Sequence, residues 1–486
     1  MQFSEVEIEK AVKYVQLDLI DDFWPDVIAY KDYLSESDWW RSVDFDSYSP
    51  GETSYIDVPK PTLVLRPGHY IEFADRIYYQ LLINRIAQQV DSQFCPQDIN
   101  FGFRISDKPS KFFRDNIESW KKFKKKDSEY FEQNTGGFLL ETDITAYFEH
   151  IKVERLTGAI SRLGVDGGTI QKIEGLLMHW AEDGIGIPQG NGCSSFLGNA
   201  YLDELDKAMI SEGYQYYRFV DDIRIFADDE QTLRRALQRL TQLLRPLNLH
   251  LAGGKTRIID NKIHLDALNH YQDVMESINY SLDIGDYGEE GGIDGSLQEI
   301  WREAISTKNI NKTVFRFCIA RFRRIESDFP LEDILNKDLY DAPNIDLVSN
   351  YLASYINEER VQKVVINKLL ASEYEYEMIY LLKLLSTASS LHFDISLIDK
   401  RAIYSKSNFL LTGYFFEIIA KFGGQGERTL MIADFNKRFA NDPRLARYFM
   451  IASSKFPKAD KEITQFHRRF PFLTSTSQYL LKTLSL

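Results

Sequence analysis

The chain has 486 residues, of which 44% are hydrophobic, and a formal net charge of −14 at pH 7. This length exceeds what one hydrophobic core usually supports, so we expect a folded protein with two or more domains. The acidic N-terminus does not resemble a signal peptide, and no apolar run is long enough to span a bilayer, so we expect a cytoplasmic protein. The negative charge argues against a protein that coats nucleic acid nonspecifically. Three widely spaced cysteines exclude a disulfide framework and a zinc motif.

Residues 1–57 combine a helical pattern with a dense aromatic region. Val6 to Leu17 has the periodicity of an amphipathic helix. Six large aromatic residues follow, and most of them are expected to pack in a core. They are Tyr30, Tyr33, Trp39, Trp40, Tyr48 and Tyr55.

The next stretch predicts a strand over 59–67, ended by a turn, and a helix from Phe73 to Val90. Between residues 108 and 126, lysine and arginine residues are interleaved with Phe112, Phe113, Trp120 and Phe123. A solvated helix face and a nucleic-acid contact both explain such a run. Its position just before an acidic strand favours the nucleic-acid contact.

The segment Tyr216–Ala227 alternates like a strand around two adjacent carboxylates, Asp221 and Asp222. Burying such a pair is costly, so we predict a hairpin with both aspartates at its tip, next to a cation. Because Mg²⁺ needs more oxygen ligands than one pair supplies, another carboxylate should come from a separate strand. Asp143, near the end of a predicted strand over 136–144, supplies it. A helix is predicted from Thr145 to Leu156.

Two similar motifs are interpreted as structural. Asp228-Asp229 also follows an aromatic residue and a small one, but a helical run starts directly after it. Acidic residues there suit a helix N-terminus. Gly253-Gly254-Lys255-Thr256 resembles the end of a phosphate-binding P-loop, but Asn248 stands where the first glycine belongs.

The last part of the chain is expected to be entirely helical. A glycine-rich and acidic stretch within 266–296 predicts a connecting loop, and successive helical patterns fill 297–486. These patterns show no strict repeat period. They therefore predict an α-helical array or an irregular bundle.

Four of these features, in this order, resemble the palm motifs of reverse transcriptases. They are Asp143 followed by Phe148, then Pro188-Gln189-Gly190, then Phe219-Val220-Asp221-Asp222, and then the segment around Lys255. The resemblance covers about residues 58–260. It implies an α/β fingers-palm polymerase domain of the right-hand type without an evident thumb, followed by an all-α, helical-repeat-like C-terminal domain. The implied divisions are residues 1–57 as a helical segment of the fingers, 58–265 as fingers and palm, 266–296 as the connecting loop, and 297–486 as the helical domain.

The resemblance also implies a role for each motif residue. Nucleotidyl transfer would use two Mg²⁺ ions, or Mn²⁺ in their place, bridged by Asp143 and Asp221. The backbone carbonyl of Ile144 would help to bind one ion, and Asp222 would complete the acidic cluster. Phe148 would exclude a 2′-hydroxyl, which implies deoxynucleoside triphosphates as substrates. The remaining implied nucleotide-binding residues are Arg66, Gln189, Gly190 and Lys255.

Departures from the family pattern favour one branch of it. The intron-type Ser-Pro-Leu is replaced by Ser194-Ser195-Phe196, the retron Asn-Ala-x-x-His pattern fails at Asp203, and no endonuclease or RNase H motif is evident. The layout is similar to the bacterial abortive-infection reverse transcriptases, the AbiK and prophage-encoded Abi types. That similarity implies anti-phage defence, a homo-oligomer, and a single-stranded DNA product made without a template from a protein primer. The candidate priming residues are Tyr30, Tyr33, Tyr48 and Tyr55.

Three alternatives stay open beside this interpretation. A conventional RNA-directed DNA polymerase would need an RNA template and a primer. A palm scaffold with dispensable catalysis would bind nucleic acid or protein partners, although the intact acidic triad argues against it because unpaired buried carboxylates are costly. A nucleotide cyclase would share the palm topology, but its hairpin carries a Gly-Gly-Asp/Glu-Glu-Phe-type motif that this hairpin lacks.

Overall fold

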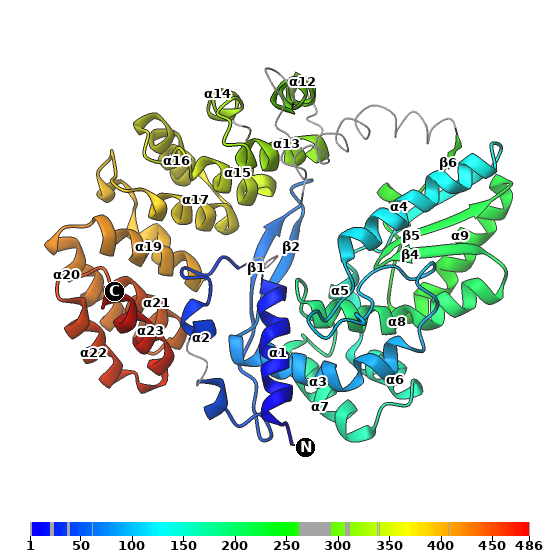
Figure 1. Ribbon diagram of the computed structural model, residues 1–486, viewed down its shortest axis with the longest axis horizontal. Coiled ribbons are helices and arrows are strands. Elements are labelled where there is room, and N and C mark those ends of the chain that lie inside the picture. The colour runs from blue at the N-terminus through cyan, green and yellow to red at the C-terminus, as the bar shows by residue number, and fades with distance from the viewer. Residues whose placement is uncertain are drawn as a thin grey trace. The chain divides into compact units, whose positions relative to one another are not determined.

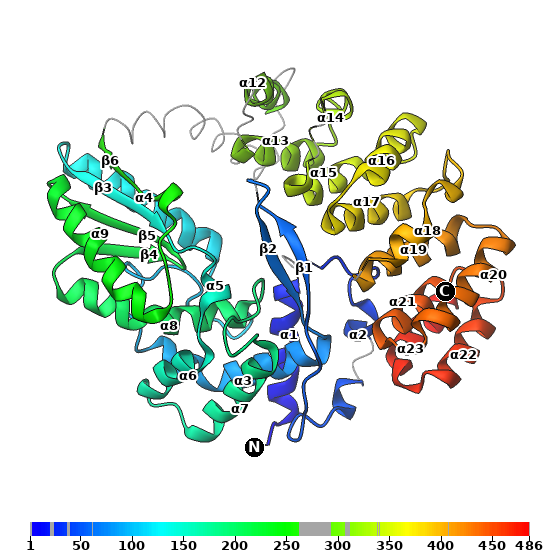
Figure 2. The same cartoon turned by 180° about the vertical axis from the view of Figure 1, so that it is seen from behind.

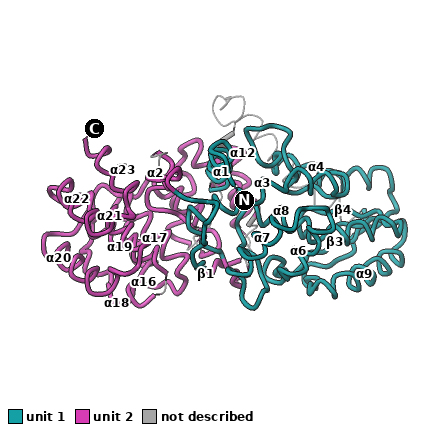
Figure 3. Tube along the Cα trace, turned by 90° about the horizontal axis from the view of Figure 1, so that it is seen from below, with its two compact units in different colours: residues 1–23, 43–55, 68–270 teal, residues 24–42, 56–67, 271–486 magenta. Residues whose placement is uncertain are grey.

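The structure is a computed structural model that describes residues 2–19, 24–35, 39–60, 62–261, 293–306, 312–337, 339, 341–406 and 408–485. The chain forms two compact units (Figure 3). Unit 1 comprises residues 1–23, 43–55 and 68–270, and unit 2 comprises residues 24–42, 56–67 and 271–486. The units therefore do not divide after residue 57, because two N-terminal segments pack with the C-terminal helices.

Unit 1 contains a four-stranded antiparallel sheet with the strand order β4-β5-β3-β6 (Figures 1 and 2). Its strands are β3 (Phe138–Asp143), β4 (Gln215–Phe219), β5 (Asp222–Ala227) and β6 (Arg257–Asp260). Its helices are α1 (Glu5–Asp18), α3 (Phe73–Asp91), α4 (Asn116–Gln133), α5 (Tyr147–His150), α6 (Val153–Arg162), α7 (Gly167–Trp180), α8 (Gly192–Ser211) and α9 (Glu230–Leu244), with short 3-10 turns η3 (Arg245–Leu247) and η4 (Gly253–Lys255). The predicted hairpin at 216–227 and the helices near 6–17 and 73–90 are confirmed.

Successive side chains of β4 point to opposite faces of the sheet, as the period of two requires. Tyr217 packs with Phe123 and Phe131 of α4 on one face. Tyr216 and Arg218 both contact Asp206 of α8 on the other face. The sheet is therefore covered on both sides, and only the ends of its strands are left to form a site.

Two predicted elements differ in the structure. The single helix predicted over 145–156 is divided into α5 and α6, because Ile151 and Lys152 are extended. Lys152 instead forms a β-bridge with Ile185, and the Ile151 carbonyl accepts the Gly186 N–H at 2.8 Å. This pairing with a distant segment overrides the local helical pattern.

The strand predicted over 59–67 is also wrong. β1 (Ser54–Pro59) ends before this region and β2 (Leu65–Tyr70) begins inside it. Between them the Lys60 N–H donates to the Val64 carbonyl at 2.8 Å, and Leu63 adopts a φ of 63°. A tight turn therefore occupies the middle of the predicted strand.

The described part of unit 2 is helical apart from residues 56–67, which include parts of β1 and β2. Its elements are α2 (Lys31–Ser35), η2 (Trp40–Ser42), α12 (Ile293–Ser306), α13 (Lys312–Arg324), α14 (Leu331–Asn336), η5 (Ala342–Asn344), α15 (Ile345–Leu352), α16 (Glu359–Ala371), α17 (Glu375–Thr387), η6 (Ile395–Leu397), α18 (Lys400–Tyr404), α19 (Phe409–Phe422), α20 (Gln425–Asp434), η7 (Phe435–Phe439), α21 (Pro443–Ser453), α22 (Ala459–Arg469), η8 (Pro471–Leu473) and α23 (Thr474–Leu484). Helices α13, α15, α17, α19 and α21 pack one against the next in an array. Most of the predicted loop 266–296 lies outside the described residues, and α12 begins at Ile293.

A buried ion-pair network ties the N-terminal segment to this array. Arg447 of α21 donates to Asp26 at 2.6 Å and to Asp32 at 2.7 Å, and all three side chains are buried. Tyr448 and Thr476 donate further hydrogen bonds, each at 2.8 Å, to the same two carboxylates. Buried charges of this kind need their partners, so residues 24–42 belong to unit 2. None of the helices described is both long and apolar enough to cross a membrane.

Candidate active site

The turn between β4 and β5 is strained and internally braced. Phe219 pairs with Asp222, which leaves Val220 and Asp221 as the two turn residues. Val220 has a φ of 56°, a conformation that a β-branched residue rarely adopts. The Arg218 guanidinium donates to the Val220 carbonyl at 3.0 Å and binds both oxygens of Asp206 at 2.7 Å. Since the Arg218 side chain is fully buried, this network holds the turn that presents Asp221.

Three carboxylates meet at this end of the sheet, as the sequence predicts. Asp143 and Asp222 are register partners across β3 and β5, and the Ile144 N–H donates to the Asp221 carbonyl at 3.2 Å. Burial, and then the charge of Asp143, raise the pKa of Asp221 to about 7. Burial also raises the pKa of Asp222, although Arg224 opposes it. Carboxylates that raise one another's pKa in this way would be stabilised by a cation.

Two cationic side chains already lie beside these carboxylates. The Lys255 ammonium is 2.7 Å from Asp143 Oδ2, and the Arg224 guanidinium contacts Asp222. Lys255 is brought there by a backbone pairing in which the Ala252 N–H donates to the Asp143 carbonyl at 2.7 Å. A cavity of about 340 Å³ opens at this point. Its lining residues are Glu141, Thr142, Asp143, Asp222, Arg224, Gly254, Lys255 and Arg257.

The described residues contain no group of three or more His, Cys, Asp or Glu side chains that could hold a metal ion. The donor chemistry nevertheless fits a hard divalent cation. Asp143 supplies carboxylate oxygens from the end of β3 and Asp221 supplies them from the β4–β5 turn, and the charge of Asp143 raises the pKa of Asp221. These two side chains are the ones able to hold such an ion.

The predicted nucleotide-binding residues Phe148, Gln189 and Gly190 lie together in unit 1. The Ile187 N–H donates to the Phe148 carbonyl at 3.0 Å, which places the Pro188-Gln189-Gly190 loop along α5. The Tyr147 hydroxyl donates to the Gly198 carbonyl at 2.6 Å, and a Cβ at Gly198 would lie 3.1 Å from the Tyr147 ring. Gly198 therefore lets α8 lie close to the rings of Tyr147 and Phe148.

His69 is a site residue that the sequence analysis missed. Its Nδ1 accepts the backbone N–H of Gln189 at 3.1 Å. Burial lowers the pKa of His69 to about 4, so the imidazole stays neutral and keeps this acceptor. No local pattern around residue 69 marks it, because its partner is 120 positions away.

The remaining predicted residues are divided between the two units. Arg66, Tyr30 and Tyr33 belong to unit 2, whereas Tyr48 and Tyr55 belong to unit 1. The Tyr48 hydroxyl donates to Asp75 at 2.7 Å, and Tyr30 is buried. Tyr55 is 68% exposed.

The basic and aromatic run at 108–126 has a largely structural explanation. Phe123 is fully buried, and Trp120 contacts Phe219 with ring centroids 5.1 Å apart. Lys121 and Lys125 form ion pairs with Glu118 and Glu129 of the same helix. The aromatic residues therefore attach α4 to the sheet, and the lysines form its polar face.

Comparison with known proteins agrees with this site. Residues 58–274 match the family model described as "Reverse transcriptase (RNA-dependent DNA polymerase)", so this segment is a reverse transcriptase domain. The match supports an enzyme of the nucleotidyltransferase class, like the RNA-directed DNA polymerases. No curated protein matches the chain.

Solved structures of telomerase are among the structures to which the chain is similar. Apo telomerase from Candida tropicalis is 10% identical over 83% of this chain and 69% of that chain, with a TM-score of 0.36. Telomerase from Candida albicans in complex with a TWJ fragment of telomeric RNA is 10% identical over 72% of this chain and 69% of that chain, with a TM-score of 0.34. The C. tropicalis apo telomerase truncated from its C-terminal domain is 11% identical, with a TM-score of 0.33. The chain covers 51% of that last structure, and the alignment spans 43% of this chain.

Proposed function

We propose that this protein is a DNA polymerase of the reverse-transcriptase type that joins deoxynucleotides at Asp143 and Asp221. The observation that carries the proposal is the meeting of these carboxylates, from β3 and from the β4–β5 turn, beside Lys255 within a reverse transcriptase domain. In this proposal the sheet and its covering helices form the palm of a right-hand polymerase.

Each residue of the site has its own role in the proposed reaction. When bound, Mg²⁺ or Mn²⁺ would activate the 3′-hydroxyl and stabilise the pyrophosphate that leaves. Asp143, Asp221 and the Ile144 carbonyl would hold these ions. Arg224 contacts Asp222 at the edge of the cluster and opposes the rise in the pKa of Asp222 that burial causes.

Lys255, Phe148 and the loop at 188–190 would position the nucleotide. The Lys255 ammonium would leave Asp143 for the triphosphate, since its side chain is 68% exposed and free to swing. The Phe148 ring would pack against the sugar where a 2′-hydroxyl would lie. The 3′ oxygen would lose its proton to solvent and form a bond to the α-phosphorus. The bond between that phosphorus and the α–β bridging oxygen would break, and pyrophosphate would leave with the bridging oxygen.

The test is incorporation of labelled deoxynucleotides in Mg²⁺ by the wild-type protein and by Asp221→Asn. We expect synthesis by the wild-type protein and none by the variant, with an unchanged circular dichroism spectrum. Synthesis by Asp221→Asn at the wild-type rate would overturn the proposal. It would favour the scaffold interpretation, in which catalysis is dispensable.

We further propose that the polymerase acts in the bacterial cytoplasm in abortive infection, as a homo-oligomer that makes single-stranded DNA without a template from a tyrosine primer. The similarity of layout described above supports this proposal. Among the four candidate tyrosines, exposure favours Tyr55, because Tyr30 is buried and the Tyr48 hydroxyl is bound to Asp75.

Denaturing gels separate this proposal from its conventional alternative. We expect label to stay with the wild-type protein when no strand is added and to be lost in Tyr55→Phe, with Tyr48→Phe as the matched control. Label that remains in Tyr55→Phe would exclude this tyrosine. Label that appears only after addition of a primer and an RNA template would establish a conventional RNA-directed DNA polymerase.

A further inference from the structure

Asn199, in the middle of α8, is a buried polar residue that none of the reaction steps above uses. It begins the Asn-Ala pattern that breaks at Asp203, and its side chain is fully buried. A buried amide is costly unless its polar atoms are hydrogen-bonded. Both atoms of Asn199 are: Nδ2 donates to the Gly102 carbonyl at 2.7 Å, and Oδ1 accepts from the Arg218 guanidinium at 2.8 Å.

The two partners of Asn199 have opposite hydrogen-bonding chemistry. The Gly102 carbonyl can only accept a hydrogen bond and the Arg218 guanidinium can only donate one, so a single orientation of the amide satisfies both. An aliphatic side chain of similar size would make neither bond, and an ionised carboxylate would make only the bond to Arg218. Asn199 therefore joins the segment around Gly102 to the strand that carries Arg218.

The segment around Gly102 runs along the edge strand β4 as far as the β4–β5 turn. The Arg218 N–H donates to the Ile99 carbonyl at 2.7 Å, and the Phe101 N–H donates to the Arg218 carbonyl at 3.0 Å. At its end the segment reaches Val220, since a Cβ at Gly102 would lie 3.0 Å from Val220 Cγ2. The missing side chain at residue 102 therefore lets this backbone lie directly against the turn.

Two groups hold Val220 in the turn, and Asn199 binds both of them. The Arg218 guanidinium donates to the Val220 carbonyl at 3.0 Å, and the Gly102 backbone lies against the Val220 side chain. Val220 has a φ of 56°, which a β-branched residue rarely adopts, so the turn needs such contacts to keep its conformation. By binding Arg218 and Gly102 together, Asn199 sets the distance between them.

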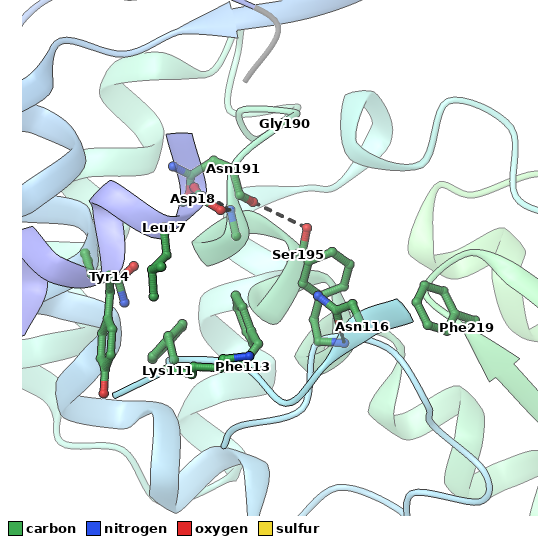
Figure 4. Close-up of a pocket in the computed structure, with 14 residues that line it drawn as sticks. Tyr14, Leu17, Asp18, Lys111, Phe113, Asn116, Gly190, Asn191, Ser195 and Phe219 are labelled. Carbon is green, nitrogen blue, oxygen red and sulfur yellow. Dashed lines mark hydrogen bonds between the residues drawn. The ribbon is translucent and has the colours of Figure 1, made fainter. Parts of the chain in front are cut away.

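Packing constrains the turn less on the side of Phe219, the residue before Val220. Phe219 is one of the residues that line a cavity of about 480 Å³, together with Phe113 (Figure 4). Close packing normally fixes a buried side chain, and the cavity removes part of that constraint. The hydrogen bonds of Asn199 therefore contribute more to the position of the turn.

We infer that Asn199 is a positioning residue for the proposed reaction, because it holds the turn in the position that keeps Asp221 beside Asp143. This inference rests on the proposed function of those two carboxylates. Asn199 itself is buried behind the turn and is not among the residues that line the cavity at Asp143. Its loss should therefore lower kcat and leave the KM for the nucleotide unchanged.

Three substitutions disturb the turn in different ways. Asn199→Leu has a similar volume and removes both hydrogen bonds. Asn199→Asp keeps the shape and the acceptor for Arg218 but, when ionised, cannot donate to Gly102, and it replaces the leucine variant if that variant does not fold. Gly102→Ala keeps Asn199 and places a methyl group 3.0 Å from Val220 Cγ2, which displaces the turn from the other side.

Two matched controls leave the turn in place. Tyr216→Phe removes a buried hydrogen bond of 2.8 Å to Asp206, in the same network but without a link to the turn. Gly175→Ala adds a methyl group at an exposed position of α7, where the new atom would meet no neighbouring part of the described chain within 4 Å.

The variants are compared by kcat and KM for one deoxynucleotide in Mg²⁺ and by hydrogen exchange of the Ile144 amide. This amide donates to the Asp221 carbonyl at 3.2 Å, so its exchange reports the position of the turn without requiring catalysis. We expect the variants of Asn199 and Gly102 to lose about 10-fold to 100-fold in kcat at an unchanged KM, and to exchange the Ile144 proton about 10-fold faster. Both controls should match the wild-type protein in kcat and, after correction for global unfolding, in exchange.

Wild-type kcat and wild-type exchange in the folded Asn199 variants would overturn the inference. A higher KM at an unchanged kcat would also overturn it, because Asn199 would then act on nucleotide binding. An equal loss of kcat in Tyr216→Phe would overturn it by assigning the effect to the whole buried network. A wild-type protein that incorporates no nucleotide, with faster Ile144 exchange in the Asn199 variants, would remove the proposed function and leave the hold of Asn199 on the turn standing.

Discussion

The pairs Asp221-Asp222 and Asp228-Asp229 lie at opposite ends of β5, and each follows an aromatic residue and a small aliphatic one. Asp221 occupies a hairpin turn and meets Asp143 from another strand, which raises its pKa to about 7. Asp229 caps α9, where Oδ1 accepts the Thr232 N–H at 2.8 Å and Oδ2 accepts the Thr232 hydroxyl at 2.7 Å. Those hydrogen bonds lower the pKa of Asp229.

The comparison shows that the element that follows a carboxylate decides its role. A helix that starts at once offers free N–H groups, which stabilise the ionised form. In the hairpin turn, a backbone hydrogen bond also lowers the pKa of Asp221, but burial and the charge of Asp143 outweigh it. The pair at 228–229 therefore caps a helix, and the pair at 221–222 is the one for which we propose a catalytic role.

The rate of nucleotide incorporation should show the largest difference between variants of Asp221 and variants of Asp229. We expect Asp221→Asn to lower the rate of nucleotide incorporation by about 10³-fold or more, because it removes a carboxylate that holds the metal. Asp229→Asn should keep the wild-type rate, since asparagine caps a helix as well as aspartate does. Rates measured in parallel at saturating nucleotide check this. Equal losses in both variants would contradict the assignment of the two pairs.

Loss of the Arg218 network behind Asp221 should lower the free energy of unfolding more than loss of an exposed ion pair near Asp229. Arg218→Met leaves the buried carboxylate of Asp206 unpaired, so we expect a loss of about 3–5 kcal/mol in the free energy of unfolding of unit 1. Arg234→Met breaks an exposed pair with Glu230 and should cost at most about 0.5 kcal/mol. Urea denaturation of both variants measures the difference. A similar shift in the two midpoints would mean that Arg218 does not hold the turn.

The pH dependence of stability should reveal the raised pKa of Asp221. Between about pH 4 and pH 7 the unfolded chain has lost the Asp221 proton while the folded protein keeps it. Without metal, stability should therefore fall as pH rises through this window, by up to about 1.4 kcal/mol per pH unit from this group. Asp221→Asn should flatten the profile relative to the wild-type protein. Identical profiles would contradict the burial of an ionisable Asp221.

Metal binding should also distinguish the pairs. Mg²⁺ at pH 8 should raise the melting temperature of the wild-type protein and of Asp229→Asn by a few degrees, because only the folded state binds it. Asp221→Asn should show no such rise. Removal of the ion with a chelator should return the wild-type protein to its metal-free value. A rise in all three proteins would place the ion elsewhere.

The smallest effect should come from loss of the helix cap. Asp229→Ala removes both hydrogen bonds to Thr232, so we expect a slightly lower melting temperature and an unchanged rate per folded molecule. Thermal melts and rates normalised to folded protein check this. A loss of rate without a loss of stability would give the second pair a catalytic role.

Tertiary contacts explain where the predictions from sequence were wrong. The pattern over 145–156 is helical, but pairing with Ile185 extends residues 151 and 152. The sequence around His69 does not indicate its role, because that role arises from a hydrogen bond with the distant Gln189 N–H. Residues 24–42 read as part of the N-terminal region, yet Arg447 binds Asp26 from 421 positions away.

The sequence by itself determined the strand that ends at Asp143 and the hairpin that carries Asp221 and Asp222, because alternation, turn residues and motif spacing are local properties of the chain. It also predicted that Asp221-Asp222 lies in a hairpin and that Asp228-Asp229 lies at a helix N-terminus, since both signals lie within a few residues of each carboxylate. Only the tertiary structure decided that Lys255 faces Asp143 across 112 positions, that Arg218 braces the turn, and that N-terminal segments join the helical unit. Those outcomes depend on contacts between residues that are distant in the sequence. The buried charges of Arg218 and Arg447, in particular, are stable only where the fold supplies their partners.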